Sequence, residues 1–220
     1  MKADMHMHST ASPDAHVDPV KILRMMKAKG FGAVAILDHN TMKGTTAASG
    51  SAKEIGILLI RGMEVSSEAG HIGALSIQEE IPKGLSAGET VDRIHSQGGL
   101  AVALHPYRMN TGIGEKNVKS CKFDAVEVVN GFTSDRRNSR ALELANSLGL
   151  PCTAGSDAHF ETEMGMAFVE IDDCSDQDEF MRLLIAKKSV PGGHGLSDLG
   201  AIKGSFVLTW EWMARGFGRL

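Results

Sequence analysis

The sequence has few cysteines and no long apolar segment. Its three cysteines, Cys121, Cys152 and Cys174, are widely spaced and odd in number. They therefore form neither a disulfide framework nor a Cys-x-x-Cys zinc site, which indicates a reducing compartment. No uninterrupted apolar stretch approaches the ~20 residues that a membrane helix needs, and no signal peptide is visible at the start of the chain. These absences predict a cytoplasmic protein without membrane contact.

The sequence also lacks an excess of positive charge. Its 23 Lys and Arg residues are outnumbered by 27 Asp and Glu residues, for a net charge of −4. A general nucleic-acid-binding surface usually has the opposite sign, so nucleic acid is expected only as a short substrate. No internal repeat or Pro-rich hinge divides the 220 residues, which suit one domain. We place that domain at 1–195, followed by an apolar and aromatic tail at 196–220 that we expect to pack on the domain or on a second copy in a homo-oligomer.

Strand and helix patterns alternate along the chain. Continuous apolar runs such as 33–37 are typical of parallel strands that are covered on both faces. The helices have start and stop signals, among them Asp18-Pro19, the capping box Ser86-x-x-Glu89 and the closing Gly149. Strands are expected at 2–8, 32–37, 57–60, 71–77, 100–104, 125–129, 152–154 and 167–171. Helices are expected at 19–30, 45–54, 86–98, 134–148 and 175–188. The pattern predicts an α/β fold, either a barrel or a doubly wound sheet.

One pair of strands departs from this alternation. The run at 71–77 follows the preceding apolar run too closely for a helical crossover. Parallel strands need such a crossover, so we expect an antiparallel hairpin here.

Histidine and carboxylate residues follow the apolar runs. The first strand ends in His6-x-His8, whose side chains project to the same face because residues alternate along a strand. The other runs end in Asp38-His39, Glu64 (treating 57–63 as one run), His105 and Asp157-Ala158-His159. Since the carboxyl ends of parallel strands share one edge, these side chains are expected to meet there. Asp14 and, through the hairpin, His71 could join them. The candidate metal ligands are His6, His8, Asp14, His39, Glu64, His71, His105, Asp157 and His159.

Nine ligands are too many for one ion and suffice for two or three divalent ions. Imidazole mixed with carboxylate suits zinc, manganese or iron(II), and suits calcium poorly. Three such ions would bring a charge of +6, against −3 from the three carboxylates. The resulting positive charge of about +3 would attract an anionic ester. A metal-activated hydroxide could then attack phosphorus. Arg108 could bind a phosphate oxygen, although a solvent-facing position fits its spacing equally.

The sequence resembles the PHP family, named for domains in bacterial DNA polymerases and histidinol phosphatases. The similar stretches appear in the family's order over about residues 2–170, and they are D-M-H-M-H-S-T-A-S-P-D, L-D-H-N-T-M-K-G, G-M-E-V-S, A-L-H-P-Y-R and G-S-D-A-H-F. V-E-V-V-N-G also looks like the stand-alone phosphoesterase members. In many members a histidine stands at the position of Asp14.

The resemblance implies a distorted, TIM-like barrel of seven strands with a trinuclear metal site. It implies that the first ion is bound by His6, His8, Glu64 and Asp157. It implies that Glu64, bridging, binds the second ion with His71 and His105. The third ion would be bound by Asp14, His39 and His159.

The leading functional hypothesis is a metal-dependent phosphoesterase acting on a small phosphate monoester or a nucleotide. Asp157 is a predicted catalytic residue, Arg108 the predicted phosphate ligand, and His194 or a water the proton donor. Alternatives are an exonuclease on short oligonucleotides, an amidohydrolase cleaving a C–N bond, and a non-catalytic metal-binding domain. Asp38 is expected to orient a ligand histidine, whereas His16 and His95 are expected outside the site.

Overall fold

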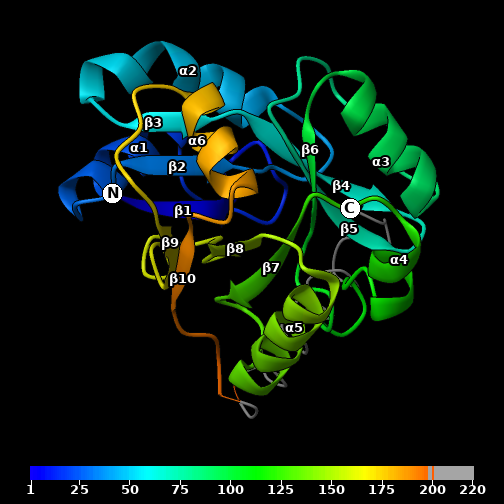
Figure 1. The fold of residues 1–220 in the computed structure, drawn as a ribbon. Coiled ribbons are helices and arrows are strands. Elements are labelled where there is room, and N and C mark those ends of the chain that lie inside the picture. Colours follow the sequence, from blue (N-terminus) through cyan, green and yellow to red (C-terminus); the bar gives the residue numbers. More distant parts are fainter. Residues whose placement is uncertain (198–199, 201–220) are drawn as a thin grey trace.

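A computed structural model describes residues 1–197 and 200 of the chain. They form an α/β fold with two five-stranded sheets, one in the order β10-β9-β1-β2-β3 and one in the order β4-β5-β6-β7-β8 (Figure 1). The strands are β1 (Lys2–Met7), β2 (Ala33–Ile36), β3 (Leu58–Ile60), β4 (Gly62–Ser67), β5 (Gly70–Leu75), β6 (Leu100–Ala103), β7 (Ala125–Asn130), β8 (Cys152–Gly155), β9 (Ala167–Glu170) and β10 (Val190–Gly193).

The helices begin and end at the signals that the sequence contains. Asp18 accepts the Val20 and Lys21 N–H groups and caps α1, Ser86 and Glu89 form the capping box of α3, and Gly149 ends α5 in a left-handed conformation. The helices are α1 (Pro19–Ala28), α2 (Lys43–Ile55), α3 (Ala87–Ser96), α4 (Glu115–Ser120), α5 (Asp135–Leu148) and α6 (Gln177–Ile185).

Backbone hydrogen bonds link β1 and β2 of the first sheet to strands of the second. Beyond β2, the Asn40 N–H donates to the Glu64 carbonyl of β4 at 2.8 Å. Beyond β8, the Asp157 N–H donates to the His6 carbonyl of β1 at 2.7 Å. Pairing therefore runs through β1, β2, β4, β5, β6, β7 and β8 and returns to β1, which is the order that a seven-stranded ring requires. The closed barrel itself stays a prediction.

The predicted hairpin is confirmed, because β4 and β5 pair antiparallel with Glu64 opposite Gly73. The apolar run at 57–63 was wrongly treated as one strand. It is interrupted at Arg61, so β3 pairs with β2 in one sheet and β4 begins the other. Glu64 thus lies inside β4 rather than at the end of a parallel strand. The sequence analysis did not identify α4 and β10, which are short, and β10 contains a proline and two glycines.

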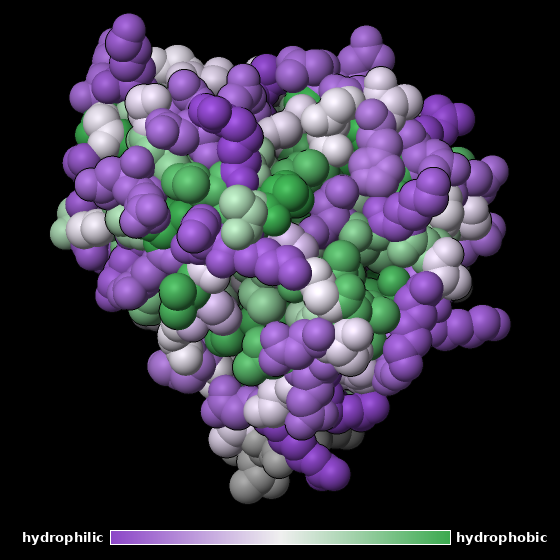
Figure 2. All heavy atoms as spheres, viewed as in Figure 1, coloured by the Kyte–Doolittle hydropathy of each residue, from purple (hydrophilic) through white to green (hydrophobic). Residues whose placement is uncertain are grey.

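Apolar side chains fill the space between helices and sheets. Ile22, Leu23 and Met26 of α1 are fully buried and pack in one cluster with Val34 and Ile36 of β2. On the face shown in Figure 2, hydrophilic residues dominate the outline and apolar residues lie between them near the centre. Among the described residues no helix has the length and apolar character to cross a membrane. The predicted tail lies almost entirely outside the described residues.

Asp4 is a fully buried carboxylate that ties β1 to the segment after β8. It accepts the Ser156 N–H at 2.9 Å, the Ser156 hydroxyl at 2.6 Å, the Gly165 N–H at 3.0 Å and the His6 N–H at 3.2 Å. Burial raises the pKa of Asp4 to about 6, although these donors oppose the change. The carboxylate therefore holds together two segments that carry predicted metal ligands.

Replacing Asp4 with asparagine is expected to lower the free energy of unfolding by about 2–4 kcal/mol, because an amide NH₂ would face donors and charge-assisted bonds would be lost. Urea denaturation with a chelator present would measure the change. Asp92→Asn, on an exposed position of α3, is the control and is expected to change the value by less than about 0.5 kcal/mol. Equal behaviour of the two variants would contradict the structural role of Asp4.

Candidate metal centre

The nine predicted ligand residues lie together in one cluster. Their side chains are at most 12% exposed, although all nine are ionisable. They come from β1 and the loop after it, the loop after β2, the β4–β5 hairpin, and the loops after β6 and β8. Charged groups are rarely buried unless they are paired or bind a metal, so this cluster marks a site.

Glu64 lies at the centre of the cluster. Its Oε1 atom is 2.7 Å from His71 Nδ1 and 3.2 Å from His105 Nε2. Its Oε2 atom is 2.7 Å from a third imidazole, His39 Nδ1. Two further imidazoles, those of His6 and His8, lie 3.7 and 3.5 Å away. One carboxylate thus contacts five histidine rings, an arrangement suited to bridging two ions.

A second group surrounds Asp157. Its Oδ1 atom is 3.1 Å from His8 Nε2 and 3.5 Å from His6 Nε2, and these two nitrogens are 3.2 Å apart. Nitrogen and oxygen ligands lie ~2.0–2.2 Å from zinc, so two donors on one tetrahedral ion are separated by about 3.3 Å. The three donor atoms therefore have the spacing that one divalent ion requires.

A third group contains Asp14, His39 and His159. Asp14 Oδ2 is 3.4 Å from His39 Nε2 and 3.5 Å from His159 Nε2. Asp14 Oδ1 is buried without a hydrogen-bond partner. Buried polar atoms are normally satisfied, so this unpaired acceptor fits a bound cation. Mixed nitrogen and oxygen donors match zinc, manganese or iron better than calcium.

Neighbouring residues of the cluster have pKa values that are shifted in opposite directions. Burial would lower the pKa of His39, but the Glu64 and Asp14 carboxylates raise it to about 10. Burial lowers the pKa of His8 to about 3, helped by the neighbouring rings of His39 and His159. Burial would raise the pKa of Asp157, but His6 and Arg108 hold it well below its usual range. A divalent ion binding here would displace the protons that such histidines carry.

Close backbone approach and unusual backbone angles shape the site. A Cβ atom on Gly155 would lie 2.3 Å from the Cβ of His6, so only glycine lets β8 lie against β1 at this point. His105 and Asp157 have backbone φ angles of 27° and 56°, a region that residues other than glycine rarely adopt. Such conformations persist where the surroundings impose them, which is common at functional sites.

Glu127 is a functional candidate that the sequence analysis missed. This buried β7 residue has Oε1 2.9 Å from His6 Nδ1, while Oε2 accepts the His105 N–H at 2.9 Å. Asn130 Nδ2 donates to Glu127 Oε2 at 2.9 Å and to Asp157 Oδ2 at 3.2 Å. Glu127 thereby fixes a proton on His6 Nδ1 and leaves Nε2 facing the cluster. A glutamate inside the otherwise apolar run 125–129 was the available signal.

Glu127→Gln is expected to weaken metal affinity by about 10- to 100-fold. The amide oxygen accepts the His6 Nδ1–H bond less strongly than a carboxylate does, and the amide NH₂ could instead donate to Nδ1 and move the His6 proton to Nε2. Competition with a metal indicator would measure the affinity. The matched control is Glu143→Gln, at an exposed position of α5. If Glu127→Gln bound metal like this control, Glu127 would have no role in holding His6.

Asp38 contacts the cluster through a serine, in keeping with its predicted orienting role. Its Oδ1 atom accepts the Ser12 hydroxyl at 2.8 Å, and Ser12 Oγ lies 3.3 Å from His8 Nδ1. The Ser12 oxygen can therefore accept the His8 Nδ1 proton, which directs Nε2 towards Asp157.

Four other residues considered in the sequence, none of them a predicted metal ligand, differ in their contacts. Arg108 is mostly buried and donates to Asp157 Oδ2, so it is not a simple solvent-facing arginine. His194 is exposed, with Nδ1 3.1 Å from the Gly195 carbonyl oxygen. His95 pairs with Asp124 at 2.8 Å, and His16 is exposed and stacks on Phe160, as expected for residues outside the cluster.

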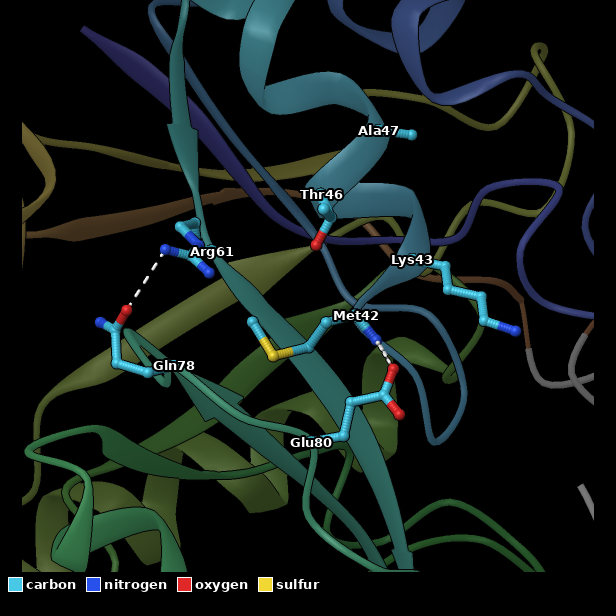
Figure 3. Close-up of a pocket in the computed structure, with 7 residues that line it drawn as sticks. All are labelled: Met42, Lys43, Thr46, Ala47, Arg61, Gln78 and Glu80. Carbon is cyan, nitrogen blue, oxygen red and sulfur yellow. Dashed lines mark hydrogen bonds between the residues drawn. The ribbon is translucent and has the colours of Figure 1, made fainter.

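A separate pocket of about 410 Å³ lies where α2 begins (Figure 3). The Met42 N–H donates to Glu80 and Arg61 donates to Gln78 across its wall. None of the nine clustered residues lines it. Its lining consists of Met42, Lys43, Thr46, Ala47, Arg61, Gln78 and Glu80.

Comparison with known proteins connects this cluster to a family. Residues 4–159 match the model of the PHP domain, and residues 135–189 match a PHP-associated model. An uncharacterized protein of Methanocaldococcus jannaschii is 39% identical over 146 residues, which is 61% of this chain and 85% of that protein. A 5′-3′ exoribonuclease of Haemophilus influenzae is 38% identical over 86 residues, or 37% of this chain and 31% of that protein.

A solved structure has the same fold. The chain is similar, with a TM-score of 0.70 and 22% identity, to a two-domain protein of Bacteroides vulgatus that contains a predicted PHP-like metal-dependent phosphoesterase. The similarity covers 88% of this chain and 65% of that one. The PHP model spans all nine clustered residues, from His6 to His159. The PHP model thus covers the greater part of the chain and all its clustered donors, and the fold agrees with it. The chain therefore belongs to the PHP domain family.

Proposed function

We propose that this protein is a metal-dependent phosphoesterase that hydrolyses a small phosphate monoester or a nucleotide. The observation that carries the proposal is the gathering of five imidazoles around one buried carboxylate, Glu64. Similarity to the phosphoesterase-containing structure supports the same chemistry. In this proposal the linked sheets form the distorted seven-stranded barrel, which brings the ligand-bearing loops to one rim.

Two or three divalent ions would be held by the three donor groups around Glu64, Asp157 and Asp14. The chemistry that such ions supply is activation of water as a nucleophile and neutralisation of phosphate charge. Zinc, manganese and iron all suit these donors.

The chain's own residues orient the donors and the substrate. Glu127 holds the His6 proton at Nδ1, and Ser12 with Asp38 does the same for His8. Asn130 and Arg108 hold Asp157 Oδ2, so that Oδ1 faces the two histidines. Arg108 has five N–H donors, and those not directed at Asp157 are proposed to bind a phosphate oxygen. His194 or a water is proposed to protonate the leaving oxygen.

The test is phosphate release by manganese-loaded protein across a panel of phosphomonoesters and short oligonucleotides, beside Asp157→Ala. We expect hydrolysis of one substrate class and its loss in the variant. If neither protein releases phosphate from a monoester or a nucleotide from an oligonucleotide, the proposal is refuted, and amide substrates or a non-catalytic metal role would take its place.

Exonucleolytic attack on a short oligonucleotide is the second candidate. The observation that favours it is the similarity of 86 residues to a 5′-3′ exoribonuclease. Release of mononucleotides from an oligonucleotide, without release of inorganic phosphate from monoesters, would identify this activity.

A further inference from the structure

Three aromatic side chains lie beside the His159 end of the cluster, and the proposed chemistry does not use them. They are His16 in the loop after β1, Phe132 in the loop after β7 and Phe160 in the loop after β8. We call this set the aromatic rim. Two of these loops also carry clustered donors, so the aromatic rim belongs to the same edge of the molecule.

The rings are close to each other and to the donors. His16 and Phe160 stack with centroids 4.7 Å apart and an interplanar angle of 23°. The Phe132 ring lies 5.8 Å from the His159 ring, and the Arg108 guanidinium lies 5.8 Å from the Phe132 centroid. A group attached to a phosphate at His159 would therefore lie beside these rings.

Hydrogen bonds hold the aromatic rim in place. The Glu163 carboxylate accepts the N–H groups of both His159 and Phe160 at 2.9 Å. The His16 N–H donates to the His159 carbonyl at 3.0 Å, and the Phe132 N–H donates to Asn130 Oδ1 at 3.0 Å. The backbone of each aromatic residue is thus tied to a residue at or next to the cluster, and His16 and Phe160 cover one face of each other.

Phe160 is 44% exposed, which is a large exposure for a phenylalanine next to a buried polar site. A sugar phosphate without a base presents hydroxyl and C–H groups but no flat π surface. A nucleobase offers a flat π surface that stacks on such rings, and an arginine beside the ring strengthens the interaction.

We propose that the aromatic rim is a stacking subsite for the nucleobase of a phosphoester substrate. This inference rests on the proposed function and narrows its substrate class. The nucleobase could come from a mononucleotide or from the end of a short oligonucleotide, since both present a base one sugar away from the phosphate.

The experiment compares kcat/KM for adenosine 5′-monophosphate and ribose 5-phosphate, which differ only in the base, using manganese-loaded protein. The wild type is expected to favour the nucleotide. In Phe160→Ala the ratio of the two kcat/KM values is expected to fall roughly 10-fold or more, mainly through the KM of the nucleotide. Phe160→Tyr should restore the ratio, and the dinucleotide pApA as a third substrate separates a mononucleotide from a chain end.

The control is Leu148→Ala, at an exposed apolar position at the end of α5, which should leave the ratio unchanged. A wild type that does not discriminate, or a ratio unaltered in Phe160→Ala, would overturn the stacking subsite while hydrolysis stands. If neither ester is hydrolysed, the proposed function fails. Calorimetric measurement of the binding of the same two ligands then tests whether the aromatic rim is a stacking subsite. Tighter nucleotide binding that weakens in Phe160→Ala supports stacking, and equal binding of both ligands refutes it.

Discussion

Glu64→Gln is expected to lower phosphoesterase activity by more than about 100-fold. Replacing a residue that only orients a metal ligand costs about 10- to 100-fold, and Glu64 contacts the clustered imidazoles directly. The glutamine keeps the size of the side chain but removes the negative charge and one of the two acceptor oxygens that face His39, His71 and His105. Initial rates of phosphate release at saturating manganese would measure the loss.

Glu170→Gln is the matched control, because Glu170 is exposed on β9 and, within the described part of the chain, its carboxylate forms a 3.9 Å ion pair with Lys2 on the surface. It should retain wild-type activity. Circular dichroism of Glu64→Gln distinguishes lost chemistry from lost folding. A folded Glu64→Gln variant with wild-type rates would show that the cluster is not the active site.

Removal of divalent metal is expected to lower the melting temperature by roughly 5–10 °C. An ion at 100 times its Kd stabilises the folded state by about 2.7 kcal/mol, and for a chain of this size each kcal/mol moves Tm by about 2–4 °C. The physical reason is that a buried acceptor such as Asp14 Oδ1 stays unpaired when no cation satisfies it. Differential scanning calorimetry with and without chelator would measure the shift.

The Glu64→Gln variant serves as the control for chelation. Its melting temperature should respond much less to chelator than that of the wild type, since its site holds metal weakly. An equal response in both proteins would mean that the stabilising ion binds elsewhere.

The sequence predicts the alternation of strands and helices well where local chemistry decides it. Three such signals are Asp18 of α1, the Ser86–Glu89 box of α3 and Gly149 of α5. Each acts within its own helix, so its effect can be recognised without tertiary structure. The break at Arg61 could not be recognised in this way. Ile60 and Met63 lie in one apolar run, and only pairing with β2 on one side and β5 on the other assigns them to different sheets.

The candidate site could be predicted to a similar extent. Histidines and carboxylates at strand ends indicated most of the nine donors, because strand ends that share an edge bring such residues together. Glu64 and His71 instead lie within the β4–β5 hairpin. The supporting contacts could not be predicted. Asp4, Glu127 and Asn130 act through partners that are 152, 121 and 27 residues away in the chain, respectively, and nothing local marks those pairs. The same holds for the contact between Arg108 and Asp157, 49 residues apart.

The central claim is that the Glu64 cluster binds divalent ions, and metal content tests it most directly. Plasma emission spectrometry of purified protein, dialysed after manganese loading, would give the ions per chain for the wild type and Glu64→Gln. We expect two to three ions in the wild type and at least one fewer in the variant. A wild type without bound metal, or a variant with the same content, would contradict it.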